Sequence, residues 1–221
     1  MLRSALKARI LDGINDDPSA PVIFSDTQLD DLIEEGAEIV CQESKAIRRS
    51  VVVPLRAGYT FYSTPSVAPD VMFPYRIWNQ TLSSRLAATS MQELDDFHER
   101  WITVQRSPEL WFPVSWDQFG IWPGVAEPGG LLRVDYLAWP RGLLDDTDES
   151  ELTRPTQDAL VLYGRYIGLL KQWDAELAAS VFQEFQGQTI FANARSNILR
   201  IAHRDFRRSN LDLPSSIRTE Y

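Results

Sequence analysis

The feature that most constrains the fold is a change in the spacing of apolar residues along the chain. Toward both ends, apolar residues recur every three to four positions, which is the period of an amphipathic helix. Between residues 49 and 140 this period is lost, and short runs of β-branched and aromatic residues alternate with prolines. Proline cannot donate to a β-ladder, so these strands are expected to be short or at sheet edges. The sequence therefore predicts an α+β fold.

We divide the 221 residues into four segments on this basis. Residues 1–48 are expected to form the N-terminal helices of a helical bundle. Residues 49–140 are expected to form an inserted β-rich domain of short antiparallel strands with one short helix. Residues 141–187 hold an acidic loop and core helices, and residues 188–221 hold a basic helix and a tail. The long C-terminal helices are predicted to complete the bundle.

Three local patterns in the helical segments give specific predictions. Ser25 with Gln28 matches the capping box, which places a helix start at Ser25. Gly164 and Gly168 lie one turn apart in an apolar helix, so another backbone is expected to approach closely there. Gly187 is expected to bend the helical stretch that follows.

The β-rich segment is expected to form from strands that are close in sequence. A hairpin is predicted between 50–55 and 59–62, around a turn at Gly58. Ser90 with Glu93 is a second capping box and predicts a short helix over 91–101. The remaining runs predict further pairs: 71–79 with 81–87, and a meander of 110–116, 119–122 and 131–139.

Composition excludes several classes of protein. The chain has 22 basic and 31 acidic side chains, a net charge of −9, and such an acidic surface disfavours general nucleic-acid binding by charge. Its single cysteine, Cys41, excludes an intramolecular disulfide, and we expect it to be a half-buried structural thiol. No apolar run is long enough to span a membrane, and the N-terminus lacks the pattern of a secretory signal.

No pattern in the sequence predicts catalysis, and no cofactor or metal is expected. The chain lacks a nucleophile elbow and a glycine-rich phosphate loop. His98 is interpreted as a surface histidine in an acidic patch, and His203 as a contact residue at an interface. Adjacent carboxylates such as Asp95 and Asp96 do not give the separation that a glycosidase needs. The acidic run after residue 144 lacks the glycine of a calcium loop.

The charge is unevenly distributed. Negative charge gathers on one face of the helix after Ser25 and in the loop over 141–151. Between residues 195 and 208, by contrast, five arginines and one aspartate give a formal +4. Such an asymmetry is typical of a terminus that contacts a partner, although arginines also suit the C-terminal dipole of a helix. The tail after residue 208 is expected to become ordered on a partner.

Six of the seven tryptophans lie between residues 78 and 139. In a β domain, these side chains can fill the core, anchor a subunit interface or stack on sugar rings. Both faces of the LWFPVSW run at 110–116 are partly apolar, which favours packing or subunit contact over an open sugar platform.

In the order of its elements and in its local sequence, the chain resembles the head-to-tail adaptor (neck or connector) proteins of tailed bacteriophages, especially podophage-type adaptors that dock under the portal. The resemblance covers about residues 5–210. It is carried by IFSDTQLDDLIEEGAEIVCQE, VVVPLRAGYTFY, LSSRLAATSMQELDDFHERW, GGLLRVDYLAWP, TQDALVLYGRYIGLL and AELAASVFQEF, followed by the basic helix and tail.

The resemblance implies a structural virion protein, not an enzyme, that is assembled in the host cytoplasm. Its partners would be the portal protein, a tail tube, nozzle or fibre protein, and about eleven further copies of itself in a closed ring of about twelve. DNA would pass through the ring without specific binding, and no membrane is involved.

The resemblance also implies site residues in this chain. The portal grip would use Arg200, Arg204, Phe206, Arg207, Arg208, Leu211 and Leu213. Subunit contacts would use Trp111, Phe112, Trp116 and Trp122. An acidic channel lining would use Asp30, Asp31, Glu34, Glu35, Glu38, Asp145, Asp146 and Asp148. The alternative functions are a carbohydrate-binding β module of a tail or glycan-active protein, and an enzyme with its site among the acidic pairs.

Overall fold

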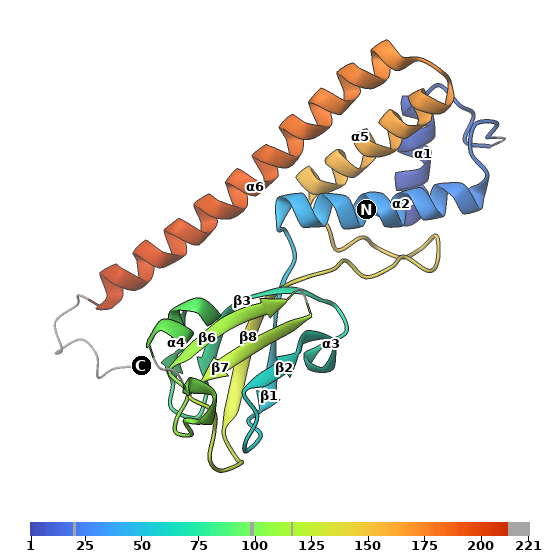
Figure 1. The fold of residues 1–221 in the computed structure, drawn as a ribbon. Coiled ribbons are helices and arrows are strands. Elements are labelled where there is room, and N and C mark those ends of the chain that lie inside the picture. The colour runs from blue at the N-terminus through green and yellow to red at the C-terminus, as the bar shows by residue number, and fades with distance from the viewer. Residues whose placement is uncertain (20, 98–99, 116, 212–221) are drawn as a thin grey trace. The chain divides into compact units, whose positions relative to one another are not determined.

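A computed structural model describes residues 1–19, 21–97, 100–115 and 117–211, with side chains in α6 described up to Asn193. The chain separates into two compact units, shown in Figure 1. Unit 1 comprises Met1–Ala46 and Gly142–Tyr221, and unit 2 comprises Ile47–Arg141. Unit 1 is helical and unit 2 holds the strands, which confirms the predicted α+β class.

Unit 1 is built from α1 (Arg3–Gly13), α2 (Asp26–Ser44), α5 (Arg154–Lys171) and α6 (Ala175–Leu211). Helix α5 contacts each of the other three, and α6 also contacts α2. The buried side chains of α1 and α2 recur at helical spacing, with Leu6, Ile10, Leu29, Leu32, Ile33 and Val40 at most 5% exposed. The amphipathic pattern read from the sequence therefore marks the buried faces of these helices.

Two glycines of α5 let α1 approach closely, as their spacing predicts. A Cβ atom built on Gly164 would lie 2.7 Å from Ile10 Cδ1, and one on Gly168 would lie 2.9 Å from Ile14 Cδ1. Gly36 of α2 does the same for α5, because a Cβ there would lie 2.6 Å from Leu160 Cδ1. Small residues thus set the spacing between helices in unit 1.

The start of α2 is fixed by its predicted capping box. The Gln28 backbone N–H donates to Ser25 Oγ, and the Ser25 backbone N–H donates to Gln28 Oε1. The helix ends at Ser44, and the C-cap residue Lys45 has a left-handed φ of 52°. These two caps satisfy backbone groups that the helix itself leaves without a partner.

Helix α6 is one continuous helix of 37 residues, and Figure 1 shows it running straight, without the bend predicted at Gly187. A Cβ atom built on Gly187 would meet nothing within 4 Å, so this glycine interrupts neither the helix nor its packing. Among the side chains of α6 that the structure describes, the buried ones are Ala178, Val181, Phe185, Thr189 and Ala192. Figure 1 shows α6 running beside α5 and continuing past its end.

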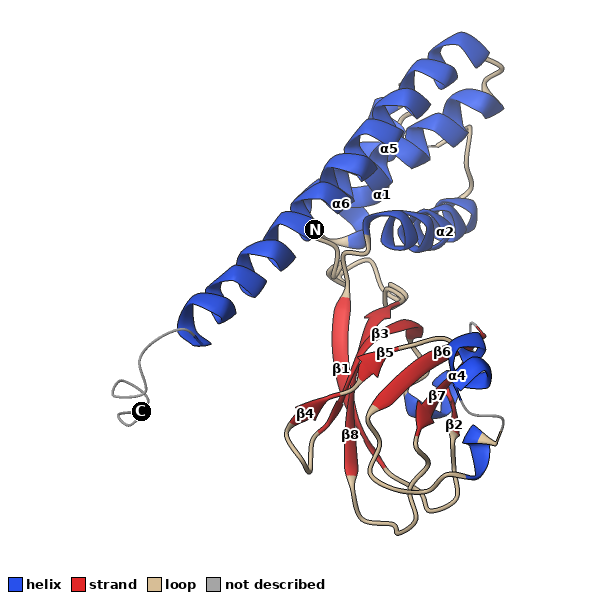
Figure 2. Cartoon of the chain, turned by 60° about the vertical axis from the view of Figure 1, so that its left-hand side comes forward, coloured by secondary structure: helices blue, strands red, loops and turns tan. Residues whose placement is uncertain are grey.

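Unit 2 contains two four-stranded sheets among its described residues (Figure 2). The first has the order β1-β8-β3-β4, and we call it sheet 1; the second has the order β2-β7-β6-β5, and we call it sheet 2. Most neighbours are antiparallel, but β5 pairs with β6 in parallel. The strand bounds are β1 (Arg48–Pro54), β2 (Phe61–Ser63), β3 (Val71–Asn79), β4 (Ser84–Arg85), β5 (Ala87–Ala88), β6 (Leu110–Ser115), β7 (Gln118–Trp122) and β8 (Leu131–Ala138).

The helices of unit 2 are short. They are α3 (Thr64–Val67), α4 (Met91–Phe97) and the 3₁₀ helix η1 (Trp101–Thr103). The predicted second capping box is present at the start of α4, because the Glu93 backbone N–H donates to Ser90 Oγ and the Ser90 backbone N–H donates to Glu93 Oε2. The predicted helix over 91–101 is therefore shorter, and it is followed by the 3₁₀ turn.

Two predicted strand pairings are wrong. The segments of the expected hairpin, β1 and β2, lie in different sheets, and β8 pairs with β1 and β3 instead of extending the β6–β7 pair. Lengths explain the outcome, because β8 has eight residues and matches the seven of β1 and the nine of β3, whereas β2 has three. Pairing β1 with β2 would leave most of its backbone groups without a ladder partner. The predicted β3–β4 and β6–β7 pairs are confirmed.

Candidate assembly surfaces

The aromatic side chains predicted at a subunit interface fill the core of unit 2. Phe112 is 0% exposed, Trp111 5% and Trp122 6%. The Trp122 indole N–H donates to the Trp101 carbonyl at 2.9 Å, and the ring of Trp101 meets Phe112 edge to face at 5.3 Å between centroids. Their own chain covers these rings, so we correct their interpretation from subunit contact to core packing. Trp116 lies outside the described residues.

Lys7 connects three parts of unit 1 through carboxylates. Its Nζ lies 2.7 Å from Asp26 Oδ1, 2.7 Å from Asp30 Oδ1 and 3.2 Å from Asp146 Oδ1, and Arg3 also pairs with Asp30. Partial burial lowers the pKa of Lys7, but hydrogen bonds to the three carboxylates outweigh it, and the pKa is raised from 10.5. The hydrogen bond from Lys7 in turn lowers the pKa of Asp26. Asp30 and Asp146 are thus engaged within the chain.

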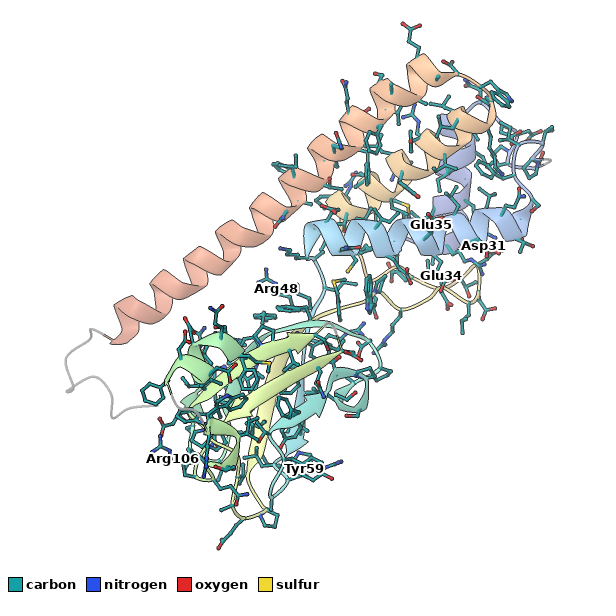
Figure 3. All side chains as sticks on the ribbon, viewed as in Figure 1. Asp31, Glu34, Glu35, Arg48, Tyr59 and Arg106 are labelled. Carbon is teal, nitrogen blue, oxygen red and sulfur yellow. The ribbon has the colours of Figure 1, made fainter. Side chains whose placement is uncertain are left out.

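The other acidic residues of α2 form an exposed face. Asp31, Glu34, Glu35 and Glu38 are exposed, and Figure 3 labels the first three of them along the helix. Glu35 accepts a hydrogen bond from the Tyr163 hydroxyl at 3.0 Å. Burial, and then this bond, raise the pKa of Tyr163 to about 12. We call Asp31, Glu34 and Glu38 the acidic face of α2, and no ion pair found among the described residues involves them.

The acidic loop is ordered by its own hydrogen bonds. Asp148 Oδ2 accepts from the backbone N–H groups of Leu144 and Asp145, at 2.8 and 2.9 Å. The loop is also fixed to the start of α1, because the Arg3 backbone N–H donates to the Asp148 carbonyl. Among the residues that the structure describes, no three His, Cys, Asp or Glu side chains converge as metal ligands would.

Sequence reasoning missed a basic face on sheet 1. In β8, Leu132 and Val134 point into the core, while Arg133 and Asp135 belong to the opposite face. Register places Arg76 of β3 beside Asp135, and Trp78 between Arg133 and Arg85. The alternation of apolar and charged residues in LLRVDYL was the available signal, but the sequence did not show which strands flank β8.

The remaining predicted residues are placed as follows. Backbone geometry continues α6 through Arg200, Arg204, Phe206, Arg207, Arg208 and Leu211, while their side chains and Leu213 lie outside what the structure describes. Cys41 is 1% exposed, so the thiol is fully buried and not half-buried as expected. His98 also lies outside the described residues, as does the side chain of His203.

The candidate sites are thus charged surfaces, which are the kind of site expected in a structural assembly protein. Among the described residues, no helix combines the length and apolarity required to cross a membrane. Comparison with family models gives a match to the SU10 adaptor protein family over residues 1–214, so the chain belongs to this family. It is a structural phage adaptor, and this family is not an enzyme class. As a virion component, it interacts with other phage head and tail proteins. A search of curated proteins finds no match.

Proposed function

We propose that this phage adaptor forms a closed ring under the portal, of the type found in podophages, and joins the portal to the tail. The observation that carries the proposal is the continuity of α6. The helix begins with side chains buried in unit 1, of which Ala192 is the last among the side chains that the structure describes, and it continues as helix to Leu211. A continuous helix fixes the direction of its far end relative to the part that is packed. The arginine-rich segment is therefore carried by the core of unit 1.

The portal is the partner that we assign to this helix and tail. The grip residues are Arg200, Arg204, Phe206, Arg207, Arg208, Leu211 and Leu213. Their positive charge suits an acidic surface on the portal, and their apolar members supply area that becomes buried when the tail orders on it. The opposite end of the ring would receive the tail tube, nozzle or fibre protein, and assembly would take place in the host cytoplasm.

Truncation after Ser196 tests the portal grip. The shortened chain retains every described buried side chain of α6, so its unfolding midpoint is expected to persist, and its helical circular dichroism is expected to fall only by the contribution of the helical residues removed. It is expected not to join portal rings in electron micrographs. A full-length chain with Arg200, Arg204, Arg207 and Arg208 changed to alanine separates lost charge from lost length. Normal stacking of both variants on the portal would place the grip elsewhere.

The ring would also line the path of the genome. About twelve chains at −9 each carry about −108 formal charges, and a negative lumen repels DNA, so DNA slides past without specific binding. We assign the lining to one of two acidic surfaces: the α2 side with Asp30, Asp31, Glu34, Glu35 and Glu38, or the loop with Asp145, Asp146 and Asp148. Asp30 and Asp146 contribute less free charge, because they pair with Lys7.

Charge reversal identifies the surface that lines the channel. Replacing exposed acids of the lining surface with lysine is expected to slow genome ejection, because DNA phosphates are then attracted to the wall. The same number of reversals at exposed acids of unit 2, Asp96 and Glu127, is the matched control for net charge. Ejection kinetics equal to those of the wild type after reversal of either candidate surface would contradict an acidic lumen at that surface.

The carbohydrate-binding alternative loses the support of three of the six tryptophans in the β-rich segment. Stacking on a sugar needs an exposed aromatic face, and Trp101, Trp111 and Trp122 are at most 6% exposed. Titration with glycans monitored by tryptophan fluorescence is expected to give no shift.

A further inference from the structure

The outer face of sheet 1 carries an excess of positive charge. Arg48 of β1, Arg76 of β3, Arg85 of β4 and Arg133 of β8 share this face with Asp135. The face bears four arginines and one aspartate, a formal +3 on a chain whose total is −9. We call these residues, together with Trp78 between them, the basic face.

Two arginines of the basic face, Arg76 and Arg133, are held in place by a shared carboxylate. Asp135 has a side chain only 3% exposed, and its Oδ2 accepts from Arg76 Nε at 2.6 Å while its Oδ1 accepts from Arg133 Nε at 2.9 Å. The Arg76 guanidinium also lies 5.7 Å from the centre of the Trp78 ring. One buried carboxylate shared by two guanidinium groups leaves net positive charge at the surface. Fixed side chains lose less entropy when they bind.

The same face has the apolar surface that an interface requires. Val52 is 48% exposed and Leu131 41% exposed, and both lie on this side of the sheet, Val52 opposite Arg133 and Leu131 opposite Pro54. Interface cores are typically rich in arginine and aromatic residues with adjoining apolar area. The composition of the basic face therefore suits docking onto a protein surface of opposite charge.

The chain itself carries a surface of that kind. Helix α2 contains no lysine or arginine, and the three carboxylates of its acidic face fall within eight residues. Their mutual repulsion is not relieved by any ion pair among the described residues. In a ring with more than two subunits, each copy must present two different, complementary surfaces to its two neighbours.

We propose that the basic face of one copy docks on the acidic face of α2 of the next copy, formed by Asp31, Glu34 and Glu38. This contact deepens the proposed function, because it rests on the ring and names the surfaces that close it. It assigns α2 to the subunit boundary, and it leaves the loop with Asp145, Asp146 and Asp148 to line the channel.

Reversal of each surface separately gives a direct test. In the full chain, Arg48→Glu with Arg85→Glu gives copies whose two contact surfaces are both negative, and Asp31→Lys with Glu34→Lys gives copies whose two surfaces are both positive. Each variant alone is expected to lose rings when incubated with portal, as seen by electron microscopy and native mass measurement. Mixed in equal amounts, the two variants are expected to regain rings with alternating subunits, because each negative surface meets a positive one.

A matched control keeps the change of charge and moves it away from the basic face. Arg106 and Tyr59 lie at the end of unit 2 away from Arg48 (Figure 3). The Arg56 guanidinium stacks over the Tyr59 ring, so Arg56 belongs to the same end. Arg56→Glu with Arg106→Glu is therefore expected to leave ring formation as in the wild type. Unchanged circular dichroism of all variants shows that they fold.

The outcomes separate this contact from the function on which it rests. Wild-type chains that form no ring with portal would overturn the ring itself. Wild-type rings that persist in both reversed variants would overturn the contact and leave the ring intact. Loss of rings in each variant without recovery on mixing would also overturn the contact. The contact would be overturned as well if the wild type retarded double-stranded DNA in a gel and Arg48→Glu with Arg85→Glu abolished this binding while the rings remained.

Discussion

Different kinds of internal packing stabilise the two units of this adaptor. In unit 1, glycines bring helices into close contact and Lys7 joins α1, α2 and the acidic loop. In unit 2, two sheets enclose aromatic rings, with Phe119 stacked on Tyr62 and Phe112 against Trp101. Both units use glycine for close packing, but the space beside a glycine is filled by an aromatic ring in unit 2, Phe112 beside Gly120, and by the aliphatic side chain of a neighbouring helix in unit 1, Ile10 beside Gly164.

The two units can be followed separately. Six of the seven tryptophans belong to unit 2, and the remaining one, Trp173, is 93% exposed, so tryptophan emission reports mainly on unit 2. Most helical residues belong to unit 1, so the far-ultraviolet circular dichroism of helices reports mainly on unit 1. Each change below is expected to alter one signal more than the other.

The largest effect is expected from Phe112→Ala. Phe112 is fully buried, and its ring fills the space that Gly120 leaves open. The substitution is expected to reduce the free energy of unfolding of unit 2 by about 3–5 kcal/mol, through lost transfer energy and the resulting cavity. Urea unfolding followed by tryptophan emission measures it. An equal shift in both signals would show that the units unfold as one.

Gly164→Val is expected to destabilise unit 1 by about 1–3 kcal/mol. Its Cβ would lie within 3.0 Å of three atoms of the Ile10 side chain, so α1 and α5 must move apart. Urea unfolding followed by helical circular dichroism measures the change. A neutral or stabilising result would mean that the Ile10 side chain can relax at no cost.

Lys7→Met is expected to cost about 1–2 kcal/mol at neutral pH, because three carboxylates lose their cation. The pH dependence gives the sharper readout. The pKa of Asp26 is lowered below 3.8 in the folded state, so its contribution is present above that pH and is lost as the pH falls through the lowered value. The raised pKa of Lys7 gives a contribution that is lost as the pH rises above about 10.5.

Stability profiles of the wild type and Lys7→Met between pH 2 and 6 measure this contribution. The acid-side loss that depends on Lys7 is expected to disappear in the variant, in the helical signal and not in tryptophan emission. Parallel profiles would assign the acid sensitivity of unit 1 to other carboxylates.

The smallest effect is expected from Gly187→Ala, and it has the opposite sign. A Cβ at this position meets nothing within 4 Å, so the substitution only removes the entropy cost of a helical glycine. A gain of about 0.5–1 kcal/mol in unit 1 is expected from thermal unfolding. Comparison of the substitutions at Gly164 and Gly187 therefore distinguishes a glycine that is required for helix packing from one that is not.

Local sequence patterns predicted the parts of the fold that depend on near neighbours. The capping boxes at Ser25 and Ser90 are present, because a cap involves residues only three positions apart. The close approach at Gly164 was also predictable, since helical spacing shows which residues share a face. The bend at Gly187 was wrongly predicted, because the cost of one glycine is small beside the packing of the whole helix.

The sequence by itself determined the α+β class, the buried faces of the helices and the acidic face of α2. The tertiary structure alone decided that β8 lies between β1 and β3, and that Phe112 and Trp122 belong to a core. It also gathered Arg48, Arg76, Arg85 and Arg133 onto one face. The physical reason is that helical contacts repeat along one segment, whereas partners across a sheet are chosen among strands far apart in sequence by matching length, register and burial.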